Sequence, residues 1–236
     1  MILSKLFRKL FRKLFHKMVD EDGDKAWYLN DKLHRVDGPA IEHANGDKAW
    51  FLNGNRHRED GPAVVTANGD KEWWLNDKRH RTDGPAIEHA TGDKKWYLNG
   101  KPHRTDGPAV EYVSGDKVWY INGKRHREEY ANGDKVWWLN DDYHRVDGPA
   151  IERANGNKEW YLNGNLHRED GPAVEGINGY KAWYLNGERH RIDGPAIERV
   201  NGTKLWWLNG KYITDNPFIF LIKMHESQLT SSLIPV

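Results

Sequence analysis

The chain has 236 residues, of which 37% are hydrophobic and 30% charged, so a conventional globular core would be thin. It contains no cysteine, which excludes a disulfide framework and a thiolate metal site. Residues 1–18 carry six Lys or Arg and no acid, and subtracting these six from the net charge of +1 leaves −5 for the rest. A basic nucleic-acid-binding surface is therefore not expected beyond the N-terminus.

The first segment, residues 1–19, is predicted to be a basic amphipathic helix, because at 100° per residue its Leu and Phe side chains share one face. Two interpretations stay open: an interfacial anchor that binds an anionic membrane or a partner, or a cap on the first repeat. The segment is too interrupted by cations to be a signal peptide or a membrane span. The residues expected to bind membrane or partner are Lys5, Leu6, Phe7, Arg8, Lys9, Leu10, Phe11, Arg12, Lys13, Phe15 and Lys17.

Residues 20–212 are predicted to form nine tandem β-hairpin units on a period of 23 residues, with one step of 18. Each unit repeats the string Gly, any residue, Lys, any residue, Trp, aromatic, Leu or Ile, Asn. So many Gly, Asn and Pro residues at short intervals disfavour helix, and the aromatic segments favour strands. The tryptophans expected to form the structural core of the repeats are Trp27, Trp50, Trp73, Trp96, Trp119, Trp137, Trp160, Trp183 and Trp206.

Turn residues flank the Trp segment on both sides, as in Asn45-Gly46 and Asn53-Gly54. Asn-Gly favours a two-residue type I′ turn, because both central residues need positive φ. If both turns have two central residues, Trp50 faces Ile41 and His57 on its two neighbouring strands, and Phe51 lies between Ala40 and Arg56. Apolar side chains would then cover both faces of the sheet.

A connector with the sequence His-Arg-x-Asp-Gly-Pro-Ala follows seven of the nine hairpins and is expected to bend the chain towards the next unit. The fifth copy, HREEYANG at 126–133, is five residues shorter than the others and lacks the Asp-Gly-Pro-Ala-Val stretch. We expect a bend or a missing strand edge near 128–131. The final segment, residues 213–236, leaves the pattern, and its apolar run at 217–224 is predicted to cap the last unit.

The run WYLNGKPHRTDG at 96–107 resembles the MORN repeat, and more closely its shorter variant class. The resemblance covers roughly residues 22–212 and implies an elongated all-β sheet of consecutive hairpins. Such repeats resemble adaptors for proteins or lipid surfaces, and no single activity transfers with them. Related variant repeats occur in bacteria, phages and large DNA viruses, which fits a bacterial or viral origin. The chain departs from the family where Arg stands in place of the usual second glycine after His, at Arg35, Arg58, Arg81, Arg104, Arg127, Arg145, Arg168 and Arg191.

The connectors gather residue types that are also used in catalysis, but the same groups recur in nearly every unit, whereas an enzyme needs one supported constellation. We expect each Arg to pair with an Asp or Glu of its own or a neighbouring unit. The connector histidines lie too far apart to share a metal, so we expect each to pack beside Trp and donate to a connector carbonyl. These histidines are His34, His57, His80, His103, His126, His144, His167 and His190.

The expected protein is therefore an all-β repeat scaffold without catalytic residues, cofactor, metal or small-molecule substrate. It would bind an unidentified protein partner and act in the cytoplasm or at a membrane surface. The alternative is a surface that binds glycans or polymers through the Arg residues and the second aromatic of each unit. These aromatics are Tyr28, Phe51, Trp74, Tyr97, Tyr120, Trp138, Tyr161, Tyr184 and Trp207.

Overall fold

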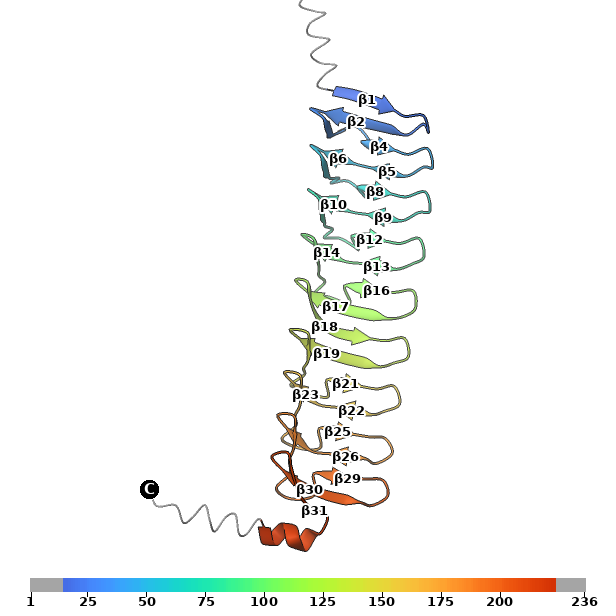
Figure 1. Cartoon of the computed structure of the whole chain (residues 1–236). Coiled ribbons are helices and arrows are strands. Elements are labelled where there is room, and N and C mark those ends of the chain that lie inside the picture. The colour runs from blue at the N-terminus through green and yellow to red at the C-terminus, as the bar shows by residue number, and fades with distance from the viewer. Residues whose placement is uncertain (1–14, 224–236) are drawn as a thin grey trace, which may run out of the picture. The chain divides into compact units, whose positions relative to one another are not determined.

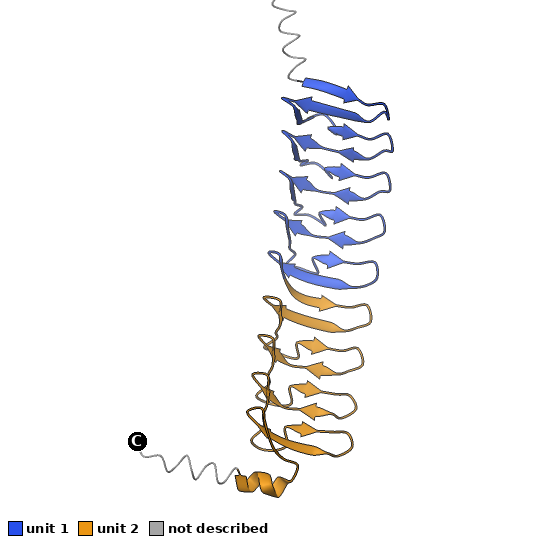
Figure 2. Ribbon diagram, in the orientation of Figure 1, with its two compact units in different colours: residues 1–124 blue, residues 125–236 orange. Residues whose placement is uncertain are grey.

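The computed structural model describes residues 15–223, and it confirms an all-β repeat of tandem antiparallel hairpins (Figure 1). The chain forms two compact units, residues 1–124 and 125–236 (Figure 2). The first contains β1 (Phe15–Val19), β2 (Lys25–Leu29), β3 (Lys32–Leu33), β4 (Ile41–Glu42), β5 (Lys48–Ala49), β6 (Phe51–Leu52), β7 (Asn55–Arg56), β8 (Val64–Val65), β9 (Lys71–Glu72), β10 (Trp74–Leu75), β11 (Lys78–Arg79), β12 (Ile87–Glu88), β13 (Lys94–Lys95), β14 (Tyr97–Leu98), β15 (Lys101–Pro102), β16 (Val110–Glu111) and β17 (Lys117–Ile121).

The second unit takes in nearly all of β18 (Lys124–Glu129) and the strands that follow it. They are β19 (Lys135–Leu139), β20 (Asp142–Tyr143), β21 (Ile151–Glu152), β22 (Lys158–Glu159), β23 (Tyr161–Leu162), β24 (Asn165–Leu166), β25 (Val174–Glu175), β26 (Lys181–Ala182), β27 (Tyr184–Leu185), β28 (Glu188–Arg189), β29 (Ile197–Glu198), β30 (Lys204–Leu208) and β31 (Lys211–Thr214). A short helix over residues 217–223 ends the described chain.

The turn after each Trp segment has two central residues, as predicted. Asn53 and Gly54 both have positive φ, 52° and 89°, and Phe51 pairs with Arg56. The N–H of His57 donates to the carbonyl of Trp50 over 3.1 Å, which confirms that these two residues are opposite each other. Asn-Gly at this position therefore forms the type I′ hairpin expected from its sequence.

The turn before each Trp segment differs from the prediction, because its loop has three residues. Ile41 pairs with Ala49 rather than Trp50, so the predicted register was wrong by one residue on this side. Of the two loop residues Asn45 and Gly46, only Gly46 has positive φ, 99°. The Asn45 side chain instead accepts the N–H of Asp47 over 2.9 Å, a local bond that favours the longer loop.

Consecutive hairpins are joined by backbone hydrogen bonds and by small buried side chains. The N–H of Gly54 donates to Leu33 of the preceding copy over 2.8 Å, and the N–H of Trp50 donates to Ala63 over 2.7 Å. No larger side chain fits at the connector alanines, which have no exposed surface. These are Ala40, Ala63, Ala86, Ala109, Ala150, Ala173 and Ala196.

The N-terminal prediction of a helix over residues 1–19 is wrong for residues 15–19, which form strand β1. Lys17 of β1 pairs with Trp27 of β2, and the His16 ring stacks on Tyr28 with centroids 5.0 Å apart. Pairing gives the backbone groups along this edge of β2 hydrogen-bond partners, which a helix lying on the edge would not do. The remainder of the predicted helix, residues 1–14, lies outside the described residues.

The C-terminal helix packs on the last copy, as the apolar run predicted. Its Pro217 follows Asn216, whose side chain accepts the N–H of Phe218 over 2.9 Å as a helix cap. Phe220 is 3% exposed, and its ring centroid lies 6.1 Å from that of Trp206. The helix therefore buries one side of the last Trp.

The short fifth copy does not lack a strand edge. Residues 128 and 129 belong to β18, which has six residues and pairs with β19 from Arg127 opposite Trp137 to Glu129 opposite Lys135. Because the bend residues are missing, the strand that leaves the hairpin runs on directly into the strand that meets the next copy. The predicted bend concerns the relation of the two units and stays a prediction.

Candidate functional site: the arginine clasp and its groove

The connector arginine folds back over the tryptophan of its own copy. In the third copy, the guanidinium carbon of Arg81 lies 3.9 Å from the ring centroid of Trp73. Its Nε donates to Asp83 over 2.9 Å, and its Nη1 donates to the carbonyl of Pro85 over 3.2 Å and to Glu88 over 2.9 Å. We call this arrangement the arginine clasp: one cation that binds two carboxylates, a carbonyl and an aromatic face.

The clasp recurs in seven copies with nearly the same geometry. The guanidinium carbon lies 3.9–4.2 Å from the ring centroid in the pairs Arg35–Trp27, Arg58–Trp50, Arg81–Trp73, Arg104–Trp96, Arg145–Trp137, Arg168–Trp160 and Arg191–Trp183. The second copy has Val65 where the other six have Glu, so its clasp has one carboxylate fewer. The expected Arg pairing with Asp and Glu is confirmed.

The glycine of the connector makes room for the guanidinium. A Cβ placed on Gly84 would lie 2.9 Å from the guanidinium carbon of Arg81, closer than real Cβ contacts. The same approach occurs at the other six connector glycines, at 2.8–3.0 Å. The clasp therefore accounts for the Arg, Asp and Gly of Arg-x-Asp-Gly-Pro-Ala, and the closed space around the Ala side chain accounts for the Ala.

The clasp lowers the pKa of its aspartate. Hydrogen bonding from Arg81, reinforced by the positive charge of Arg81, holds the pKa of Asp83 below its ordinary value of 3.8. The same cause acts on the other six clasp aspartates. These carboxylates stay ionised at neutral pH, although the side chain of Asp83 is 80% exposed and that of Arg81 only 20%.

The connector histidines bind the next copy rather than a connector carbonyl, so that part of the prediction was wrong. The Nδ1 atom of His80 lies 3.2 Å from the backbone N–H of Asn99 and 3.0 Å from its side-chain oxygen. The same backbone contact joins His34 to Asn53, His103 to Asn122, His144 to Asn163, His167 to Asn186 and His190 to Asn209. Between residues 15 and 223, no group of three His, Asp or Glu side chains is placed to hold a metal ion.

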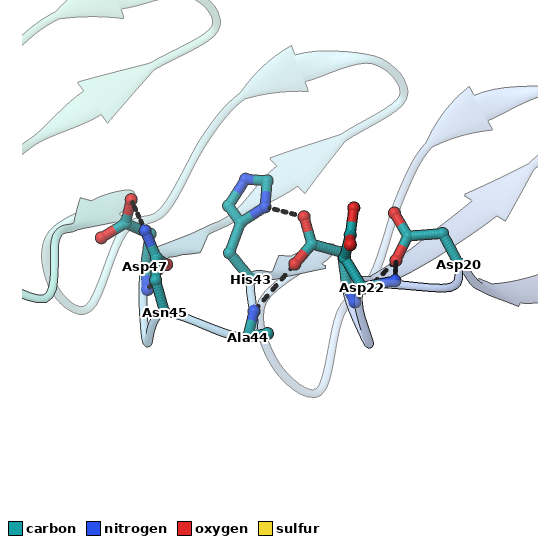
Figure 3. A network of polar contacts seen from close by, with 7 residues as sticks. Asp20, Asp22, His43, Ala44, Asn45 and Asp47 are labelled. Carbon is teal, nitrogen blue, oxygen red and sulfur yellow. Dashed lines mark hydrogen bonds and ion pairs between the residues drawn. The ribbon is translucent and has the colours of Figure 1, made fainter.

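The opposite edge of the repeats carries a second set of aspartates, which directly follow the loop glycine in six of the nine copies: Asp24, Asp47, Asp70, Asp93, Asp116 and Asp134. The carboxylate of Asp24 accepts the N–H of Ala44 over 2.8 Å and bonds to the His43 ring. Figure 3 shows this loop from close by, with His43, Ala44, Asn45 and Asp47 labelled. Equivalent bonds join Asp47 to Ala67, Asp70 to Ala90, Asp93 to Val113 and Asp134 to Ala154. Asn157 takes the same role with Ile177, which shows that the bond needs the oxygen and not the charge.

The second aromatic of each copy is half-buried, and arginines lie over several of the rings. The guanidinium of Arg79 lies 4.8 Å from the Trp74 ring centroid and 5.7 Å from that of Tyr97. Burial and a hydrogen bond to Glu159 raise the pKa of Tyr161 to about 12. These contacts use part of the ring surface that the glycan-binding alternative requires.

A groove lies between successive connectors, and it was not predicted from the sequence. The groove between the second and third connectors has a volume of about 570 Å³, with Pro62 on one side, Trp73 and Leu75 along it, and Asp60 and Asp83 beside them. Equivalent grooves of about 570, 690 and 630 Å³ follow the third, sixth and seventh connectors. No signal in the sequence shows this space, because it depends on the arginine folding inward.

The predicted N-terminal binding residues are mostly outside the described residues, which exclude Lys5 to Lys13. Of the two that are described, Phe15 is 50% exposed and the Lys17 ammonium lies 5.0 Å from the Trp27 ring centroid. Both belong to strand β1. Within residues 15–223, no helix is long and apolar enough to cross a membrane.

A scan of protein-family models and a search of curated proteins each found no match to this chain.

Proposed function

We propose that the chain is a non-catalytic repeat scaffold that binds a protein partner along the grooves between its connectors. The observation that carries this proposal is the sevenfold recurrence of the clasp. Groups that resemble catalytic residues are bound to one another in the same way in each complete copy, which leaves no copy with a distinct constellation of base, nucleophile and stabiliser. Repetition of one groove suits a partner that is itself extended.

The proposal also includes the family that the sequence resembles, the MORN variant repeats. The hairpin period and the turn after Trp support it. The departure from that family, Arg in place of glycine, is the residue that makes the clasp. We therefore assign the chain to a clasp-bearing subtype of this repeat class, whose binding surface differs from that of a glycine-bearing copy.

Affinity capture with matched variants of the full-length chain tests the scaffold proposal. The groove variant combines Asp60→Asn, Asp83→Asn and Asp106→Asn. The control combines Asp47→Asn, Asp70→Asn and Asp93→Asn, which removes the same charge from the opposite edge at positions where Asn157 shows that Asn is accepted. A specific partner should be retained by the wild type and the control and lost from the groove variant. Equal retention by all three proteins would contradict the proposal.

A membrane tether by Lys5 to Lys17 remains a second proposal, supported by the cationic and apolar sequence of residues 1–18. Co-sedimentation with vesicles of anionic lipid should compare the full chain with a chain that starts at Phe15. This start preserves β1, whose loss would expose the edge of β2 and confuse the result. Equal sedimentation of the two chains would contradict the tether.

The glycan alternative is tested at rings on the other side of the hairpins. A glycan array probed with the wild type and with Tyr97→Ala and Tyr184→Ala would support it only if binding is seen and is lost in the variants.

A further inference from the structure

The grooves present carboxylates to solvent while their cations lie beneath. In the three consecutive clasps of Arg58, Arg81 and Arg104, the arginine side chains are 20–25% exposed, and the paired Asp60, Asp83 and Asp106 are 80–83% exposed. A molecule approaching the groove therefore meets negative charge first. The lowered pKa of each aspartate keeps that charge present at neutral pH.

Each complete clasp is also acidic as a whole. It combines one arginine with an aspartate and a glutamate, as in Arg81, Asp83 and Glu88, which sum to one negative charge. The variable connector position adds another at Glu59 and Glu169, which are 83% and 85% exposed. Counted over the charged residues that line them, the grooves after the second, sixth and seventh connectors each carry one net negative charge, and the groove after the third carries none.

Apolar side chains lie between the carboxylates, next to the clasp arginines and the connector histidine. Trp73, Leu75 and Pro62 line the groove between Asp60 and Asp83, and Trp183, Leu185 and Pro172 line its counterpart between Asp170 and Asp193. Along the repeats, an exposed carboxylate therefore alternates with a recess lined by Trp, Leu and Pro. Aromatic-lined recesses of this kind bind proline-rich peptides in the polyproline II conformation.

The period of the grooves matches that conformation. Two strands per copy at about 4.8 Å give a spacing of about 9.6 Å between successive connectors. A polyproline II helix rises about 9.3 Å in its three-residue turn, so every third side chain lies on the same face. In a β-strand three residues span about 10 Å, but side chains alternate, so every third one points to the opposite face. Of these two extended conformations, only the polyproline II form places a cation at every third position opposite each carboxylate.

We propose that the grooves bind a proline-rich segment in the polyproline II conformation with Lys or Arg at every third position. The cations of the segment pair with the exposed clasp aspartates, and its prolines occupy the recesses lined by Trp, Leu and Pro. Four connectors in succession, from Asp37 to Asp106, give the longest such series in the first unit. This inference rests on the scaffold proposal and names the chemistry of its partner.

Fluorescence anisotropy with synthetic peptides tests the inference on the full-length chain. The probe is a labelled peptide of five Lys-Pro-Pro repeats. Its spacing control has the same composition, with five lysines in a row followed by ten prolines, and its charge control has Glu in place of Lys. We expect the probe to bind about tenfold more tightly than the spacing control, and the charge control not to bind.

The same two triple variants locate the binding. The groove variant should weaken binding of the probe by about tenfold, and the opposite-edge control should change it by less than about twofold. Equal affinity for the probe and its spacing control, equal weakening by both triple variants, or no binding of the probe would each overturn the inference. If circular dichroism shows that the groove variant is unfolded, the spacing comparison on the wild type decides.

The outcomes separate this inference from the scaffold proposal. If the peptides fail to bind but affinity capture still retains a partner that the groove variant loses, the scaffold proposal stands and the polyproline chemistry is wrong. If the groove variant loses neither the captured partner nor affinity for the probe peptide, both proposals fail.

Discussion

Two kinds of copy differ in whether the strand continues through their tryptophan: copies with a complete connector on both sides, and copies with an unbroken strand on one side. Where a complete connector lies on both sides, as at Trp50 and Trp73, the strand is interrupted at Trp and splits into two short strands. Where β1, β18 or β31 takes the place of one connector, the strand runs through the Trp without a break, as in β2, β19 and β30.

This difference shows what the connector does. A strand on one side gives Trp a regular ladder partner, such as Arg127 opposite Trp137. A connector instead brings a buried alanine beside the Trp and sends its arginine over the ring. The five residues missing from the fifth copy therefore replace the connector on one side of Trp137 with an ordinary strand, while the Arg145 clasp still covers the ring from the other side.

The largest loss of stability is expected when the residue beside Trp in one kind of copy is replaced by the residue that the other kind has there. Ala109 has no exposed surface, so Ala109→Arg forces a long cation into a closed space and should cost about 3–4 kcal/mol. Arg127 lies in the equivalent register position, where Arg127→Ala should cost about 1 kcal/mol or less. Urea denaturation of both variants measures the difference. Similar losses would show that the two positions are equivalent.

A smaller effect is expected from removing the clasp arginine. Arg81→Ala should cost about 2–3 kcal/mol, because a stacked, charge-assisted donor is lost and its carboxylates are left unpaired. Arg58→Ala should cost about 1 kcal/mol less, since Val65 already deprives that clasp of its glutamate. Thermal unfolding of the two variants makes the comparison, and a larger loss from Arg58→Ala would contradict it.

Replacing the connector glycine should lower stability only while the clasp arginine is present. Gly84→Ala should cost about 1–2 kcal/mol, because its new methyl group displaces the Arg81 guanidinium. In the Arg81→Ala background the same substitution should cost nearly nothing. A loss that persists in that background would mean that Gly84 is needed for its backbone conformation instead.

The smallest effect is expected from pH. Because the pKa of Asp83 is lower in the folded chain, the unfolded chain binds more protons near its ordinary value of 3.8. The contribution of the clasp is therefore complete above pH 3.8 and is lost as pH falls through the lowered value. Asp83→Asn should reduce the fall in stability between pH 5 and pH 3, measured by urea denaturation. An unchanged slope would exclude the clasp as a source of acid sensitivity.

The sequence predicted the hairpin repeat, because its spacing of Trp, Asn and Gly carries local information. It also predicted the type I′ turn at Asn53-Gly54 and the pairing of Arg with Asp and Glu. It did not predict the three-residue loop at Asn45-Gly46, where the Asn side chain changes the turn through a bond to Asp47. Identical Asn-Gly dipeptides thus form different turns at the two ends of the Trp segment.

The groove and the N-terminal strand could not be predicted for a different reason. The groove depends on Arg81 lying over Trp73, a contact between residues eight positions apart that no periodicity reports. Residues 15–19 have helical periodicity, but the free edge of β2 offers backbone hydrogen bonds that override it. In both places the tertiary partner decides the structure.

The central claim is that the repeated charged residues are a structural clasp, and a double-mutant cycle between Arg81 and Glu88 tests it most directly. Unfolding free energies of the wild type, Arg81→Ala, Glu88→Ala and the double variant should give a coupling of about 1–2 kcal/mol. Introducing Val65→Glu should create a similar coupling with Arg58, where none exists now. A coupling indistinguishable from zero at Arg81 and Glu88 would show that these charges do not hold the repeat together.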